Sequence, residues 1–322
     1  MQCDSRSLRG VIPALVTPID GQGDVDERSL EHLIRFQLDA GVHGIFVGGS
    51  SGEVALLDGA QRATLVKVAV GMVAGAVPVL VGAVDTGTRR VIEQARKAVA
   101  LGADAVVVTA PFYVRPNPRE IVEHFRLVQA ALGHPVVAYD IPSAVGSRLT
   151  PDIVEELAAS KLVVGLKDSS GDLVTFREIV RRTRRMDRQG SFPVLSGSEL
   201  LADVAIELGA HGLVPGLANV DPHGYVRLFH AASTADRAKA RAEQDRLAKL
   251  FEIISVADLG RIGFTAGALG AFKAALALRG IITNGATNVP LSALNERELE
   301  AIARILHETG LAPDVPLHVE VA

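Results

Sequence analysis

One lysine in the sequence stands where an amine could act as a nucleophile. Lys167 ends an apolar run over residues 162–166, and Asp168 follows it. A run that is apolar on both faces is typical of a strand buried in a parallel sheet. Burial disfavours the ammonium form, and a neutral amine adds to ketones to form a Schiff base. Lys167 is therefore a candidate imine-forming residue; the alternative is a lysine at a strand end that reaches water.

Two serines share a glycine-rich turn that could bind an anion. Ser50 and Ser51 follow Gly49 within residues 48–53, directly after another apolar run. A tight turn of this composition presents free backbone N–H groups beside two hydroxyls, which suits a carboxylate or a phosphate. An ordinary glycine turn without a ligand is the alternative interpretation.

Two tyrosines are candidates for proton transfer. Tyr139 ends the apolar run that precedes the run of Lys167, so both side chains could face the same opening. A phenol there could pass protons to and from a carbinolamine, and the alternative is a hydroxyl that simply reaches solvent. Tyr113 lies in a proline-bounded loop, where a surface aromatic residue is the simpler interpretation.

The elements that must position these residues are short apolar runs separated by segments of helical periodicity. Asp58 with Gln61, and Thr150 with Pro151, have the residue types of helix N-termini. Strand and helix alternating eight times favour a (β/α)8 barrel, with a doubly wound sheet as the alternative. The predicted strands are residues 11–17, 44–48, 78–84, 105–110, 135–141, 162–168, 192–197 and 212–216. Barrel active sites lie at the carboxyl ends of the strands, where the candidates above are found.

The chain changes character after about residue 232, where strand patterns cease. We expect a catalytic barrel domain over residues 1–232 and a small helical domain over residues 233–322, with helices over 234–257, 265–279 and 292–309. Lys273 falls in the second of these helices, and we expect it to be a solvated helix residue.

Composition and motifs exclude several other classes of protein. A net charge of −4 and a pI near 6.2 argue against nucleic acid or an anionic membrane as the main partner. The histidines include no pair at metal-binding spacing, and no P-loop or dinucleotide fingerprint is present. The single cysteine, Cys3, excludes a disulfide framework. Without an apolar leader or an 18-residue apolar stretch, a soluble, cytoplasmic protein is expected.

Taken together, four motifs resemble those of the dihydrodipicolinate synthase/N-acetylneuraminate lyase family of Schiff-base aldolases. They are residues 49–53, 111–113, 139–142 and 165–168, and the similarity extends over nearly the whole chain. The resemblance implies a homotetramer whose chemistry uses no metal or organic cofactor. It also implies an imine between Lys167 and pyruvate or another 2-keto acid.

The resemblance gives the other candidates roles as well. Tyr139 would move protons, and Ser50 would link it to Tyr113, supplied across a dimer interface. Ser51, in the turn that begins at Gly49, would hold the keto-acid carboxylate through its hydroxyl and N–H, and the carbonyl of Val214 would line the site.

Departures from the family pattern concern the substrate. Dihydrodipicolinate synthases carry a carboxylate-binding arginine two residues after Pro142, where this chain has Ala144. An alanine cannot make that bidentate contact, and Arg148 lies elsewhere in the loop. Gly197, Ser198 and Glu199 resemble instead the loop with which keto-deoxy-sugar-acid aldolases read hydroxyls.

These observations predict a lyase that reversibly cleaves a 2-keto-3-deoxy sugar acid to pyruvate and an aldehyde. Dihydrodipicolinate synthase (4-hydroxy-tetrahydrodipicolinate synthase) and a keto-deoxy-sugar-acid dehydratase are the alternatives within the family. A non-catalytic keto-acid-binding protein is the alternative from another class.

Overall fold

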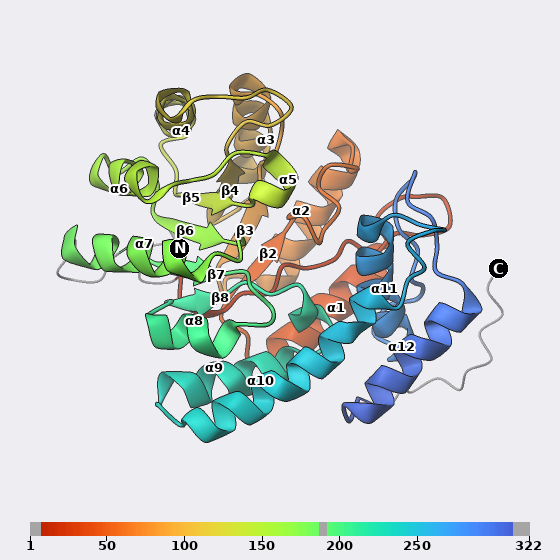
Figure 1. Cartoon of the computed structure of the whole chain (residues 1–322). Helices are drawn as coiled ribbons and strands as arrows, with labels where there is room; N and C mark the ends of the chain where they lie inside the picture. Colours follow the sequence, from red (N-terminus) through yellow and green to blue (C-terminus); the bar gives the residue numbers. More distant parts are fainter. Residues whose placement is uncertain (1–7, 187–191, 312–322) are drawn as a thin grey trace.

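Eight parallel strands form one curled sheet at the centre of the molecule (Figure 1). The structure, a computed structural model, describes residues 8–186 and 192–311, so Cys3 lies outside the described residues. The strands run in the order β1-β8-β7-β6-β5-β4-β3-β2. They are β1 Gly10–Val11, β2 Ile45–Val47, β3 Val79–Gly82, β4 Ala105–Thr109, β5 Val136–Asp140, β6 Gly165–Asp168, β7 Val194–Ser196 and β8 Gly212–Leu213. Each lies within its predicted run, except that β1 begins one residue earlier.

The two edges of the sheet meet and close it. Ala14, just beyond β1, forms a parallel bridge with Phe46 of β2. Leu15 N donates to Phe46 O at 2.8 Å, which continues the ladder across the join. The (β/α)8 barrel predicted from the sequence is therefore confirmed, and the strand ends that carry the candidate residues share one rim.

Helices surround the sheet (Figure 1). Asp58 and Gln61 form a reciprocal capping box at the start of α2, and Thr150 caps α6 with Pro151 as its first residue. The helices of the barrel are α1 Glu27–Asp39, α2 Gly59–Val73, α3 Thr88–Ala100, α4 Pro118–Leu132, α5 Pro142–Val145, α6 Pro151–Ala159, α7 Leu173–Met186, α8 Ala202–Leu208 and α9 Pro222–Ser233.

Alternate residues of each strand face the barrel interior and the helices. Val137 and Tyr139 of β5 belong to the interior cluster with Phe46, whereas Val136 and Ala138 pack in the larger cluster that includes the helices. The position of a polar residue along its strand therefore decides whether its side chain enters the barrel or lies between the sheet and the helices.

Among the described residues, three further α-helices follow α9. They are α10 Arg237–Phe251, α11 Phe264–Leu278 and α12 Glu296–Glu308. Helix α10 packs against α9 and α8, and α12 lies against α11 on the side away from the barrel (Figure 1). The Gln244 side chain of α10 accepts a hydrogen bond from Ala202 N and donates one to Glu199 O, each at 3.0 Å. The C-terminal helices thus contact the loops at the barrel rim. That residues 233–322 form a domain of their own stays a prediction.

The expectation for Lys273 is wrong. Its side chain is fully buried and forms an ion pair with the buried carboxylate of Glu53. Helix α11 is buried on nearly all sides from Ala266 to Leu278, so it has no face along which this lysine could reach water. A polar residue in a helix that is apolar all round is therefore a core residue here.

Candidate active site at the barrel mouth

Lys167 lies inside the barrel among aromatic rings. Only 5% of the residue is exposed, and its Nζ is 4.2 Å from the ring centroid of Tyr139 and 4.9 Å from that of Phe46. The amine is therefore removed from bulk water at the carboxyl end of β6 and lies within cation–π distance of two ring faces.

Tyr139 stands beside Lys167 because their strands are paired in register. Tyr139 of β5 is opposite Lys167 of β6, and Thr109 of β4 is opposite Tyr139. Both tyrosine and threonine are buried, and Thr109 Oγ1 has no hydrogen-bond partner in the described structure. Sequence reasoning missed Thr109, although its position at the end of a buried strand is a signal of the same kind.

The serine turn, residues 48–53, follows β2 and is held by its own backbone. Glu53 N donates to Ser50 O at 3.1 Å, and Thr17 Oγ1 donates to Gly52 O at 2.8 Å. Ser50 is exposed and Ser51 half-buried, whereas Gly49 is buried. The turn therefore presents its two hydroxyls at the surface of the rim and keeps its glycines inside.

Gly197, after β7, lets the hydroxyl of Ser169 approach the lysine. A Cβ on Gly197 would lie 2.1 Å from Ser169 Oγ and 3.2 Å from Lys167 Cε. Only glycine fits there without displacing these groups. Ser169 is a second residue that sequence reasoning missed, although it lies two positions beyond Lys167, a spacing that repeats the side-chain direction along a strand.

The carboxylate of Glu199 accepts hydrogen bonds from other residues of the chain. Its Oε1 accepts hydrogen bonds from Gly216 N at 2.7 Å and Leu217 N at 3.2 Å, and its Oε2 accepts one from Tyr225 Oη at 2.6 Å. Burial raises the pKa of this carboxyl, which the hydrogen bond from Tyr225 opposes. Val214 faces the barrel interior and Ser198 is half-buried in the neighbouring loop.

Tyr113 projects away from its own barrel. The residue is 96% exposed and has φ = +69°, an unusual left-handed conformation for an aromatic residue. It borders a cavity of about 580 Å³ together with Val145 and Arg148. Ala144, in the short helix α5, is also exposed. The structure therefore does not bring Tyr113 to the lysine within one chain.

Two buried carboxylates lie on the helix side of β5 and β6. Asp140 and Asp168 are paired in register and point to the helix side of the sheet. Asp140 accepts hydrogen bonds from Leu149 N at 2.9 Å and Arg148 Nε at 3.3 Å. Burial raises the pKa of Asp140 to about 6, against the hydrogen bond from Leu149, and the charge of Asp168 raises it further. Burial also raises the pKa of Asp168.

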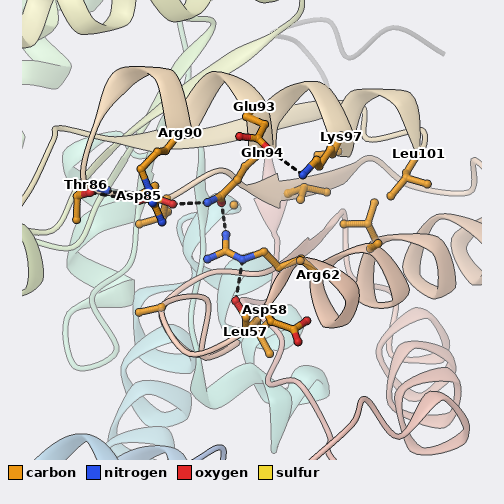
Figure 2. A pocket seen from close by; sticks show the side chains of 18 of the residues that line it. Leu57, Asp58, Arg62, Asp85, Thr86, Arg90, Glu93, Gln94, Lys97 and Leu101 are labelled. Atoms are coloured by element: carbon orange, nitrogen blue, oxygen red, sulfur yellow. Dashed lines mark hydrogen bonds and ion pairs between the residues drawn. The ribbon is translucent and has the colours of Figure 1, made fainter.

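A separate cavity of about 520 Å³ lies between α2 and α3 (Figure 2). Hydrogen bonds link Arg62, Gln94, Asp85 and Arg90 across it. The lysine on its wall, Lys97, is well exposed and forms an ion pair with Glu93. Unlike Lys167 at the barrel mouth, it is not buried.

Over residues 8–186 and 192–311, no three His, Cys, Asp or Glu side chains are grouped as a metal site would require. Within the same residues, no helix has both the length and the apolar character to cross a membrane.

The model of the dihydrodipicolinate synthetase family matches residues 7–309. The chain belongs to this family. It is 36% identical to an uncharacterized DapA-like lyase of Halobacterium salinarum over 308 residues, 96% of each chain. It is 34% identical to the 4-hydroxy-tetrahydrodipicolinate synthase of Methanosphaerula palustris over 301 residues, 93% of this chain and 98% of the relative.

Solved structures of the family share the fold of this chain. YagE, a prophage protein of the dihydrodipicolinic acid synthase family from E. coli K12 solved in complex with pyruvate, is 27% identical with a TM-score of 0.87, covering 95% of this chain and 99% of YagE. Dihydrodipicolinate synthase from Bacteroides thetaiotaomicron is 31% identical, also with a TM-score of 0.87, covering 94% and 98%. The family resemblance noted in the sequence is thus confirmed.

Proposed function

We propose that this lyase forms an imine between Lys167 and a 2-keto acid and makes or breaks the carbon–carbon bond next to pyruvate. The observation that carries the proposal is the buried Nζ of Lys167, 4.2 Å from the ring centroid of a tyrosine on the neighbouring strand. The pyruvate complex of YagE and the names of the lyase relatives support the same chemistry.

The proposed reaction begins when Lys167 Nζ adds to the C2 carbonyl. The carbinolamine loses water to give an iminium ion, and the Tyr139 phenol carries the protons that this exchange requires. In the cleavage direction, the Tyr139 oxygen takes the proton of the C4 hydroxyl, the C3–C4 bond breaks and C4 leaves as the aldehyde. The electron pair moves onto the iminium nitrogen, giving an enamine. Protonation at C3 and hydrolysis then release pyruvate and free the lysine.

The serine turn is the proposed binding site for the keto-acid carboxylate. Ser51 offers its hydroxyl and N–H at the rim, and Ser50 would pass protons between Tyr139 and Tyr113 of a second subunit. That Tyr113 is almost wholly exposed supports an assembly in which it is covered by, and serves, a neighbouring barrel. The proposed assembly is a homotetramer, and the proposed location is the cytoplasm.

The substrate we propose is a 2-keto-3-deoxy sugar acid. Ala144 offers no side chain that could bind a second carboxylate, Ser169 and Ser198 provide hydroxyls at and next to Gly197, and Thr109 provides one opposite Tyr139. Because Glu199 already accepts three hydrogen bonds, its contribution would be to fix the loop at Gly216 as much as to read a sugar hydroxyl.

Borohydride reduction in the presence of pyruvate tests the imine. The wild-type chain should gain the mass of one reduced pyruvate, and Lys167→Ala should gain none. An unmodified wild type, or equal labelling of the variant, would overturn the proposal. Product analysis over a panel of 2-keto-3-deoxy acids then separates aldol cleavage, which releases pyruvate, from dehydration. Condensation of pyruvate with aspartate semialdehyde tests the synthase alternative.

A further inference from the structure

A buried ion pair joins the last part of the chain to the serine turn. Lys273 Nζ of α11 pairs with Glu53 Oε1, and the side chains of both residues are fully buried. Lys273 Nζ also donates to Ala286 O at 2.7 Å. Glu53 Oε2 accepts hydrogen bonds from Asn288 N at 2.6 Å and from Asn288 Nδ2 at 3.1 Å. The carboxylate is thus held from two segments that lie far beyond the barrel strands in sequence.

Glu53 occupies a backbone position that needs such a restraint. Its φ is +57°, in the left-handed region that residues with a side chain avoid. The backbone of Glu53 also closes the turn, since its N–H donates to Ser50 O. Anchoring the side chain therefore fixes the conformation of the backbone that carries Ser50 and Ser51.

The same helix lies near the turn at a second point, on the other side of Gly216. A Cβ on Gly216 would lie 2.9 Å from Ser51 Oγ, 3.1 Å from Phe272 Cε2 and 3.3 Å from Glu199 Oε1. Phe272, next to Lys273 in α11, and Ser51 therefore border the same glycine. Helix α11 thus packs close to the hydroxyl at the rim while its lysine holds the end of the turn.

We infer that Lys273 and Glu53 are positioning residues, through which the C-terminal helices hold the serine turn in its carboxylate-binding conformation. The inference rests on the proposed function, because the turn must be the carboxylate site. A buried ion pair is by itself weak support for stability, since apolar groups of similar volume often replace one without loss. If the pair positions the turn, its loss should weaken pyruvate binding. The loss of a purely structural pair should change stability alone.

The test compares a charge-neutral double variant with the wild type. Lys273→Met alone leaves the Glu53 carboxylate buried without its cation and is expected to fold poorly. The double variant Lys273→Met/Glu53→Gln removes both charges, keeps both shapes and leaves a carbonyl oxygen for Asn288 to bind. Its folding is checked by its melting temperature. The readout is the fraction of chain trapped by borohydride as a function of pyruvate concentration.

If the pair positions the turn, the double variant should melt close to the wild type but need about tenfold more pyruvate for half-maximal trapping. The maximal trapped fraction should be unchanged, because Lys167 is intact. A folded double variant with wild-type half-saturation would overturn the inference and leave the proposed function standing. A wild type that traps no pyruvate would overturn both.

Lys249 of α10 provides a matched control in the same part of the chain. It forms ion pairs with Glu252 at 2.8 Å and Glu308 at 3.2 Å, and all three side chains are substantially exposed. Lys249→Met should leave both half-saturation and maximal trapping unchanged. A similar shift in this control would show that any charge lost from the C-terminal helices weakens pyruvate binding, and would also overturn the inference.

Discussion

At the scale of single residues, the site depends on small distances around one amine. Lys167 and Tyr139 are placed together by the pairing of β5 with β6, and the absent side chain of Gly197 leaves room for the Ser169 hydroxyl beside the lysine. Electrostatic interactions between this amine and nearby polar groups are strong because the barrel interior excludes water. Substitutions here should therefore change chemistry more than stability.

Gly197→Ala is a direct test of that space. The added methyl group would overlap Ser169 Oγ and touch Lys167 Cε, so it should lower the rate of imine formation by at least about tenfold. The melting temperature should change little because the loop can adjust. Stopped-time borohydride trapping measures the rate. Gly171→Ala serves as a control, because nothing lies within 4 Å of the added Cβ. The φ of Gly171 is +75°, so this substitution adds local backbone strain without filling space beside the lysine. Unchanged trapping in Gly197→Ala would contradict the account.

Asp140 should make stability depend on pH. Its pKa is raised from 3.8 to about 6 in the folded protein, so the folded chain binds a proton that the unfolded chain releases. Stability should therefore fall as pH rises from about 4 to about 6, and the loss should persist above that range. Asp140→Asn removes this charge beside Asp168, and should stabilise the protein at pH 7 by on the order of 1 kcal/mol.

Melting temperatures of wild type and Asp140→Asn between pH 4 and pH 8 measure this effect. The difference should be largest above pH 6 and should shrink towards pH 4, where the wild-type carboxyl is protonated in the folded state and titrates in the unfolded state. A variant that is less stable than the wild type at pH 7 would show that the hydrogen bond from Arg148 outweighs the cost of burying the charge.

At the scale of elements, periodicity and apolar runs predicted the strands because barrel strands are buried on both faces. Buried pairs between distant segments could not be predicted in the same way. Lys273 has the residue type of a surface position, and only the packing of α11 against the serine turn shows that Glu53 is its partner. The sequence did not single out Ser169 and Thr109 for a related reason. Serine and threonine are common in many settings, and only the pairing of the strands shows which of their hydroxyls lie near Lys167 and Tyr139.

At the scale of the whole molecule, exposed apolar side chains are candidates for the interfaces of the proposed homotetramer. Tyr113 and Val114 are 96% and 56% exposed in the loop after β4, Val174 in α7 is 83% exposed, and Leu200 after β7 is 52% exposed. Leu259, Phe264 and Val289 are 64%, 61% and 86% exposed. Large exposed apolar side chains are typical of association surfaces when they cluster.

Sedimentation should therefore give a particle four times the chain mass of 33.9 kDa. Val174→Lys should reduce it to a dimer by placing a charge in one interface, with Tyr113 still supplied to the partner barrel and trapping by pyruvate retained. Lys161→Met, an exposed substitution on the same barrel, is the control for the mass. A monomeric wild type that traps pyruvate normally would contradict both the assembly and the role given to Tyr113.

Among the lysines of the chain, we expect Lys167 to carry the imine. Peptide mass spectrometry after reduction with borohydride in the presence of isotopically labelled pyruvate measures which lysine is modified. Labelled pyruvate should be found on the peptide that contains Lys167, with Lys273 and Lys97 unmodified. Label on another lysine with Lys167 unmodified, or no label at all, would show that Lys167 does not form the imine.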